Sequence, residues 1–316
     1  MAHSGLSELR SRDPLTRLVR CTEFEPLLEP EVLQAELLQD LRQALVRQEL
    51  QLYFQPRIDA LTLQVTAAEA LLRWQHPGCG MVNPAVFVPL AERHGLIAEI
   101  GAWVIEEAYR QAAQWRLKGL RMRIAVNISG LQLRHEGLVG LIESSLRRHQ
   151  IPPGRLSCEI TETVAMEDTA ITRLACERLR QAGLHVSIDD FGTGCSSLAT
   201  LRQLPAAELK IDRAFVAELD AGGQEAEGAR SIVRALVQMA HSLKLNVVAE
   251  GVETATQRDT LVMLGCDEFQ GYLFAKPMTA ASLALWADGN GEVAASMFRP
   301  SFFDPTAPAT LDPAAG

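Results

Sequence analysis

Residues 185–194 read HVSIDDFGTG, an apolar-alternating run that ends in two adjacent carboxylates and a Gly-Thr-Gly turn. The alternation predicts a strand, and the glycines predict a turn directly after it. Because adjacent strand residues point to opposite faces, Asp189 and Asp190 can serve one centre only with two ions or a bend. Burying an uncompensated carboxylate is costly, so we expect these acids to meet metal, cations or water. An ordinary Asp-Gly turn is the alternative.

The same unit, a strand followed by a helix, recurs along the chain. We expect eight strands, at residues 50–58, 65–74, 122–129, 156–161, 186–190, 208–212, 246–250 and 269–273. Alternating strands and helices predict a parallel sheet covered by helices, and eight such strands are enough to close a barrel. Only residues 59–64 separate the first two strands, too few for a parallel crossover, so the first runs antiparallel to the second if they are neighbours. The prediction is an α/β fold, a modified TIM-like (β/α)8 barrel with an antiparallel first strand; an open doubly wound sheet is the structural alternative.

The ends of the chain differ from this region. Residues 1–29 are charged, contain two prolines and show no sustained period, which indicates a linker or N-terminal extension. A helix that begins at Pro30 then leads into the barrel domain, expected over residues 30–290. The Pro/Ala-rich tail at residues 291–316 is expected to have little regular structure. Residues 220–228 (DAGGQEAEG) are polar and glycine-rich, so we expect a mobile loop there.

Composition excludes several classes of protein. The chain has 316 residues, and 30 Lys and Arg against 39 Asp and Glu give a net charge of -9, which argues against a surface that coats a nucleic acid polymer. An anionic ligand would therefore need metals or a few local cations. The six cysteines form no C-x-x-C pair, so neither a zinc site nor a disulfide framework is indicated. With no apolar leader and no uncharged apolar stretch long enough for a membrane span, we expect a cytoplasmic fragment.

Polar residues stand near the ends of the apolar strands, all in one register. They are Glu69, Asn127, Glu159, Glu162, Asp189, Asp190, Lys210, Asp212, Glu250, Glu253 and Gln270. The carboxyl ends of parallel barrel strands meet at one rim, so these residues predict one site there. Each has a plainer explanation, since Asn127 could cap a helix, Glu162 could lie in a first helical turn, and Lys210 could pair with Asp212 on one strand face.

The ligands expected at this rim are all oxygen atoms, which favours Mg²⁺ or Mn²⁺ over zinc. Several carboxylates in one place repel one another unless more than one cation neutralises them, so two divalent ions are the natural count. Such a pair stabilises the attacking and leaving oxygens of a phosphoryl displacement. The sequence thus favours metal-assisted hydrolysis of a phosphodiester.

Eight motifs resemble the EAL domain family in order and spacing, over about residues 32–287. They are FQP (54–56), EALLRW (69–74), AVNIS (125–129), EITE (159–162), IDDFGTG (188–194), LKID (209–212), AEGVE (249–253) and QGYL (270–273). The resemblance implies a modified barrel with an antiparallel first strand. It also implies a phosphodiesterase that hydrolyses the bacterial second messenger cyclic di-GMP to linear pGpG with Mg²⁺ or Mn²⁺. We expect Ca²⁺ to inhibit, because it is larger and accepts looser coordination than Mg²⁺. A receptor module that binds cyclic di-GMP without turnover is the alternative.

The resemblance also implies roles for single residues. One metal would be held by Glu69, Asn127, Glu159 and Asp189, and the second by Asp189, Asp190 and Glu250. Lys210 matches the lysine that orients the attacking water, and Glu250 is alternatively the general base; those two roles stay open. Glu162 matches the glutamate that steadies the loop after Asp190. The positions that match the substrate site are Gln55, Glu69, Leu72, Arg73, Asp212, Glu253, Gln270 and Pro277.

One residue departs from the family pattern, because Cys195 stands where the family usually has an aromatic side chain. The departure concerns regulation and dimer contacts more than chemistry, and we expect a homodimer. Residues 13–18 (DPLTRL) faintly resemble the opening of a GGDEF domain, which is either a coincidence or the remnant of a larger signalling protein with sensor or GGDEF domains.

Overall fold

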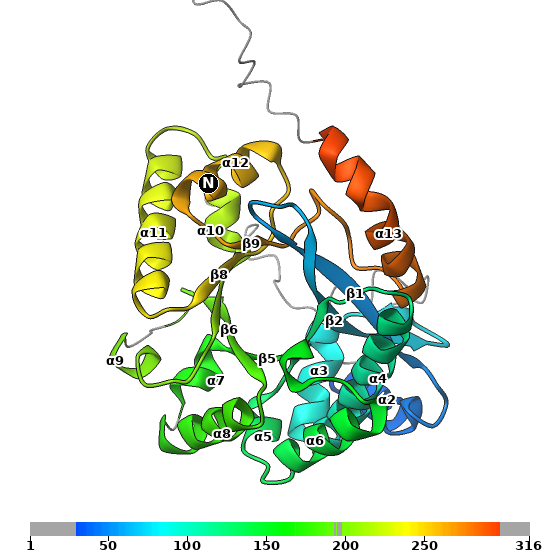
Figure 1. Ribbon diagram of the computed structural model, residues 1–316. Helices are drawn as coiled ribbons and strands as arrows, with labels where there is room; N and C mark the ends of the chain where they lie inside the picture. Colours follow the sequence, from blue (N-terminus) through cyan, green and yellow to red (C-terminus); the bar gives the residue numbers. More distant parts are fainter. Residues whose placement is uncertain (1–29, 168, 193, 195–197, 298–316) are drawn as a thin grey trace, which may run out of the picture.

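The strands form one closed barrel in the computed structural model, which describes residues 30–297 except 168, 193 and 195–197 (Figure 1). The barrel strands are β1 (Leu50–Asp59), β2 (Val65–His76), β4 (Arg123–Asn127), β5 (Leu156–Thr161), β6 (His185–Phe191), β7 (Glu208–Ile211), β8 (Asn246–Ala249) and β9 (Glu268–Phe269). They pair in that order, and β9 returns to β1. The predicted modified (β/α)8 barrel is confirmed.

The first strand is the odd member of the barrel. β1 pairs antiparallel with both β2 and β9, whereas the pairs from β2 through β4 to β9 are parallel. The hairpin loop at residues 60–64 forces this direction, as the short spacing predicted. A short strand that the sequence analysis missed, β3 (Gly80–Val82), folds back on the end of β2 and takes no part in closing the barrel.

Helices surround the strands on the outside of the barrel (Figure 1). They are α2 (Pro30–Ala44), α3 (Pro84–Arg93), α4 (Ile97–Leu117), α5 (Gly130–Leu133), α6 (Leu138–His149), α7 (Glu162–Met166), α8 (Thr169–Gln181), α9 (Leu198–Leu201), α10 (Arg213–Glu218), α11 (Gly223–Ser242), α12 (Ala255–Leu264) and α13 (Ala280–Met297). In the described part of the chain, no helix is both long and apolar enough to cross a membrane.

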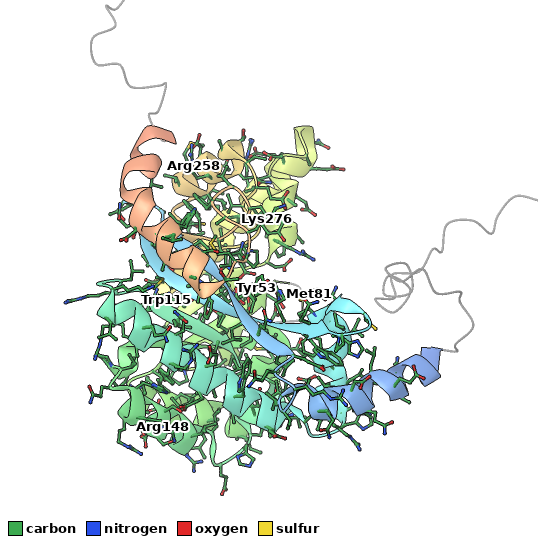
Figure 2. The ribbon with its side chains drawn as sticks, turned by 90° about the vertical axis from the view of Figure 1, so that its right-hand side faces the viewer. Tyr53, Met81, Trp115, Arg148, Arg258 and Lys276 are labelled. Atoms are coloured by element: carbon green, nitrogen blue, oxygen red, sulfur yellow. The ribbon has the colours of Figure 1, made fainter. Side chains whose placement is uncertain are left out.

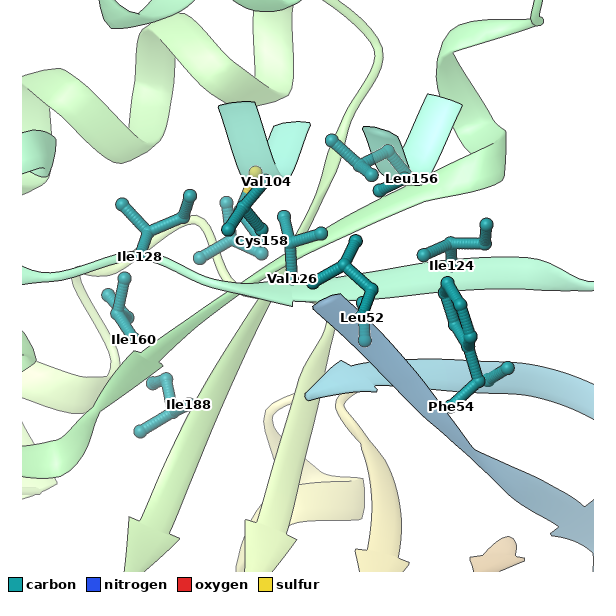
Figure 3. Packing of buried hydrophobic residues seen from close by; sticks show 14 of the residues in the cluster. Leu52, Phe54, Val104, Ile124, Val126, Ile128, Leu156, Cys158, Ile160 and Ile188 are labelled. Carbon is teal, nitrogen blue, oxygen red and sulfur yellow. The ribbon is translucent and has the colours of Figure 1, made fainter. Parts of the chain in front are cut away.

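The apolar core lies between the strands and these helices. Ile124 and Val126 of β4 are buried beside their pairing partners Leu156 and Cys158 of β5, and Val104 of α4 belongs to the same core (Figure 3). Strand side chains alternate between the two faces, so residues at every second position pack outward on the helices. The positions between them point into the barrel, and there the strands place polar side chains.

Three boundaries differ from those expected. Helix α11 begins at Gly223, so most of the segment expected to be a mobile loop is helical. The carboxylate of Glu225 in the first turn of this helix interacts favourably with the helix dipole, and Ala226 is buried. Helix α13 continues to Met297, past the expected domain boundary at residue 290, because residues 280–297 are rich in alanine. The last strand ends at Phe269, because the chain turns at Gly271, whose added Cβ would lie 2.1 Å from the Val252 carbonyl oxygen.

Other expectations fall on residues that the structure does not describe. These are the linker at residues 1–29, Cys195, and the tail beyond Met297. Helix α13 itself is held against the barrel near its start, where Trp115 of α4 donates from Nε1 to the carbonyl oxygen of Ala280 at 3.2 Å (Figure 2).

Closure of the barrel depends on the two residues of β9. Phe269 is fully buried and pairs with Ile58 of β1 and Ala249 of β8. We expect Phe269→Ala to lower the free energy of unfolding by about 3–5 kcal/mol, measured by guanidinium denaturation, because it empties a closed part of the core. Leu61→Ala, at a position 87% exposed, is the control and should change it by less than about 0.5 kcal/mol. Equal effects of the two substitutions would contradict this account of closure.

Candidate metal-binding and catalytic site

Polar side chains fill the inside of the barrel in two layers, one pleat apart. The upper polar layer, at the carboxyl ends of the parallel strands, contains Gln55, Glu69, Asn127, Glu159, Asp189, Asp190, Lys210, Glu250 and Gln270. The lower polar layer contains Arg57, Arg123, Ser187, Glu208 and Glu268. Members of the two layers stand two residues apart on one strand, as Asp189 and Ser187 do, because strand side chains alternate.

A backbone bend brings the two adjacent aspartates to one place. Asp190 has a φ of +55°, in the left-handed region, and the pairing register of β6 with β7 shifts between Ile188 and Phe191. The Asp190 amide donates to Asp189 Oδ1 at 2.9 Å, which holds the bend. Left-handed backbone is rare for residues other than glycine, and Asp is among those that tolerate it. The sequence left open two ways for both aspartates to serve one centre, two ions or a bend, and the structure has the bend.

Glu162 supports the turn that follows. It is the first residue of α7, and its Oε2 accepts hydrogen bonds from the amides of Gly192, at 2.7 Å, and Gly194, at 3.3 Å. Glycine fits this turn because a Cβ on Gly194 would lie 3.0 Å from Glu162 Oε1. Glu162 therefore lies in a first helical turn and also steadies the loop after Asp190, so both interpretations of this residue describe the structure.

The carboxylates form two groups that could each hold a metal ion. Glu69, Glu159 and Asp189 make one group, and Asp189, Asp190 and Glu250 make the other; within each, ligand oxygens lie within 4.8 Å of one another. Asp189 belongs to both. Asn127 adjoins the first group through a hydrogen bond from Nδ2 to Glu69 Oε1, at 2.8 Å. Carboxylate and amide oxygens suit Mg²⁺ or Mn²⁺, so the residues fit these ions.

A single ammonium group stands among these acids. Lys210 Nζ lies 3.7 Å from Glu69, 3.0 Å from Glu159, 2.9 Å from Asp189 and 2.5 Å from Glu250. Burial alone would lower the pKa of Lys210, but Asp189 and Glu250 raise it above its ordinary value, so the amine stays charged. Lys210 does not pair with Asp212, whose carboxylate instead caps α10 by accepting from the Ala214 amide at 2.8 Å.

The single positive charge of Lys210 does not neutralise the carboxylates of the upper polar layer. Burial, and then the charge of Asp189, raise the pKa of Asp190 to about 6. Burial also raises the pKa of Glu250 to about 8; Asp189 adds to this effect and Lys210 opposes it. Glu69 differs, because Lys210 and Arg57 overcome its burial and lower its pKa to about 2. Asp190 and Glu250 are thus the carboxylates that take up protons when no other cation is present.

Two hollows meet at these carboxylates. The main cleft is lined by Gln55, Glu69, Asp189, Asp190, Lys210, Arg213, Glu250, Gly251, Glu253, Gln270, Gly271 and Tyr272. A more apolar hollow between β2, α3 and α4 contains Leu72 and Arg73 and reaches Asn127, Glu159 and Asp190. The structure thus brings most of the expected residues together. Asp212 and Pro277 line neither hollow.

Sequence reasoning missed several residues in and under the main cleft. Arg213 and Tyr272 line it, and Arg57 lies beneath it. The signals were present, because Arg213 directly follows a strand end, Tyr272 is within QGYL, and Arg57 is two residues from Gln55 on one strand face. Gly251, with a φ of +66°, lets Arg213 approach, since a Cβ there would lie 2.4 Å from Arg213 Cβ.

Comparisons with known proteins agree with this geometry. The model of the EAL domain matches residues 38–277. The chain belongs to the EAL domain family. It is 47% identical over 251 residues to the bifunctional diguanylate cyclase/cyclic di-GMP phosphodiesterase MucR of Pseudomonas aeruginosa, covering 79% of this chain and 36% of MucR. It is 38% identical over 247 residues to the cyclic di-GMP phosphodiesterase PdeR of Escherichia coli, covering 78% of this chain and 37% of PdeR.

Solved EAL structures share the fold. The MucR phosphodiesterase of Pseudomonas aeruginosa in complex with c-di-GMP has a TM-score of 0.74 at 47% identity, over 78% of this chain and 99% of that one. The EAL enzyme Bd1971, with cAMP and cyclic-di-GMP bound, has a TM-score of 0.76 at 31% identity, over 82% and 70%. The chain spans about a third of the length of the curated relatives named here.

The raised pKa of Glu250 predicts how pH changes the stability of the metal-free protein. A carboxyl group with a raised pKa binds a proton in the folded state that the unfolded state has released, so its contribution is lost as pH rises through the folded pKa, here about 8. We expect the melting temperature of chelator-treated protein to fall between about pH 6, the raised pKa of Asp190, and about pH 8, the raised pKa of Glu250, and to level off above that. Calorimetry should show that Glu250→Gln removes this slope. A melting temperature of the original protein that rises over this range would contradict the charge imbalance described here.

Proposed function

We propose that this chain hydrolyses cyclic di-GMP to linear pGpG with the help of two divalent cations. The observation that carries the proposal is the pair of carboxylate groups joined at Asp189, beside Lys210, in an EAL barrel. Curated relatives in which the same domain occurs are named cyclic di-GMP phosphodiesterases, and the solved structures of MucR and Bd1971 named above hold c-di-GMP. Hydrolysis fits a site that combines metal-binding acids with a cleft.

Charge counting supports two ions. The five carboxylates of the upper polar layer, with the one ammonium of Lys210, leave four formal negative charges. Two divalent cations, Mg²⁺ or Mn²⁺ by the donor set, carry the same charge and would acidify a water molecule and stabilise the leaving oxygen. Glu69, Asn127, Glu159 and Asp189 would hold one ion, and Asp189, Asp190 and Glu250 the other.

The residues around these ligands have separate tasks in the proposal. Lys210 and Glu250 contact each other directly at 2.5 Å, so a water beside the pair would meet a proton donor and a proton acceptor side by side. Arg213 lines the main cleft and supplies a cation for the anionic substrate. Gln55, Glu253 and Gln270 line the same cleft and would contact the dinucleotide.

The receptor alternative is disfavoured by the residues present. A module that binds without turnover needs no complete ligand set, whereas all the expected ligands and Lys210 lie together here. We also propose that the chain is part of a larger signalling protein, because it covers only 36% and 37% of the relatives MucR and PdeR, and that it works as a homodimer, which rests on the family resemblance alone. The partner domains and the dimer contacts stay predictions.

A direct assay separates the two functions. Purified protein incubated with Mg²⁺ and cyclic di-GMP should yield pGpG, and chromatography measures the product. With Ca²⁺ in place of Mg²⁺ we expect the substrate to bind without cleavage, because Ca²⁺ accepts looser coordination and aligns the water less strictly. Tight binding in Mg²⁺ with no product would favour the receptor, and absence of binding would reject both functions. Equal turnover in the two ions would show that the geometry is less demanding than proposed.

A pair of variants tests the role of Asp189. Asp189→Asn removes the charge shared by both carboxylate groups, so kcat should fall by at least about 10³-fold and stay low at high Mg²⁺. Glu162→Gln touches neither group directly and loosens the turn at Gly192, so part of its activity should return at high Mg²⁺. Steady-state rates across a Mg²⁺ titration measure both. Equal rescue of the two variants would show that Asp189 does not bridge.

A further inference from the structure

Arg57 is a fully buried arginine directly beneath the proposed metal ligands, and 0% of its surface is exposed. Because β1 runs antiparallel to its neighbours, the chain passes Gln55 in the upper polar layer before it reaches Arg57 in the lower one. The guanidinium donates from Nη1 to Glu208 at 2.7 Å and from Nε to Gln270 Oε1 at 3.1 Å. Its Nη2 pairs with Glu159. Arg57 thus joins both layers.

The contact with Glu159 fixes how that carboxylate presents its oxygens. Arg57 pairs with Oε1, while Oε2 lies 3.0 Å from Lys210 Nζ in the upper polar layer. One oxygen is therefore tied to the layer below, and the other faces the site. A planar guanidinium imposes this orientation better than an ammonium, because its donors are held in a rigid fork.

The contact with Gln270 reaches a second proposed ligand. An amide has one accepting end and one donating end, so the oxygen of Gln270 must face Arg57 and its nitrogen must face away. That nitrogen donates to Glu69 Oε2 at 2.6 Å and to Gln55 Oε1 at 3.2 Å. Arg57 therefore orients Glu159 directly and Glu69 through one intermediate, and both belong to the same carboxylate group.

Charge distinguishes Arg57 from Lys210. Burial would lower the pKa of Arg57, but Glu208 and Glu69 raise it above its ordinary value, so the guanidinium stays charged. Lys210 contacts carboxylates of both groups, Glu159 Oε2 in the first and Glu250 Oε1 in the second. Arg57 lies on the opposite side of Glu159 and leaves Oε2 available.

We propose that Arg57 is a positioning residue that preorganises Glu159 and Glu69 for a divalent cation. The inference rests on the proposed function only in requiring a cation at this group. A purely structural arginine would neutralise Glu208 and leave the ligands unaffected, so metal affinity separates the two roles.

The test compares Arg57→Lys with a matched control, Arg123→Lys. Arg123 lies in the same lower polar layer, but its ion-pair partners are Glu268, at 2.8 Å, and Glu208, at 3.7 Å, neither of them a proposed ligand. Lysine keeps the charge at both positions and loses the fork. In a Mn²⁺ titration followed by the EPR signal of the free ion, Arg57→Lys should weaken binding by about 10–100-fold. Arg123→Lys should leave binding unchanged, and the KM for cyclic di-GMP at saturating Mn²⁺ should be the same in both variants.

The outcomes separate the inference from the proposed function. Failure of the original protein to bind Mn²⁺ would reject the metal site itself. Binding by the original protein that Arg57→Lys leaves unchanged, or that both variants weaken equally, would overturn the role of Arg57. If Arg57→Lys does not fold, the double variant Arg57→Met/Glu208→Gln keeps the buried charge balanced and serves for the same titration, with the same weakening expected.

Discussion

The interaction on which this site depends is the repulsion among carboxylates that the barrel holds close together inside a protein. Isolated charges of one sign cannot stay buried and ionised without partners. Here the strands cannot move apart, because β1 closes the ring against both β2 and β9. The repulsion must therefore be relieved by protonation, by Lys210, or by cations from solution. The raised pKa of Glu250, next to the Lys210 ammonium, shows that the lysine alone does not suffice.

The two polar layers differ in how their charges balance. In the lower polar layer, Arg57 and Arg123 face Glu208 and Glu268, so the formal charges cancel. Such a charge-balanced layer can remain buried and dry, and it supports the side chains of the upper polar layer. The upper polar layer lies one pleat above on the same strands and is left with excess negative charge. A difference of two residues along each strand thus separates a charge-balanced network from a group of carboxylates that could hold cations.

The fold was predictable because its signals are local. Period-two alternation marks the strands, and the short connection between β1 and β2 determines their direction. The errors arose where tertiary contacts decide. β9 shortens because Gly271 packs on the backbone of Val252, and α11 begins five residues before the expected loop ends, at a glycine that propensity alone would not choose. No local pattern predicts the register in which β3 returns to β2.

The clustering of the acids at one rim was predictable from the sequence, but the side chains that support them were not. Acids at successive strand ends meet at one rim whatever the exact loops, so Glu69, Glu159 and Asp189 could be placed together from sequence. The bend at Asp190 could not be predicted, because a residue with left-handed backbone does not change the alternating pattern of apolar residues in the sequence. Arg57 was missed for a related reason: in sequence it is one charged residue on a strand. Its importance arises only when the antiparallel direction of β1 carries it across the barrel to Glu159 and Gln270. The residues that end the strands identify the proposed ligands. The orientation of those ligands depends on contacts between side chains from opposite sides of the barrel, and such contacts form only once the barrel is closed.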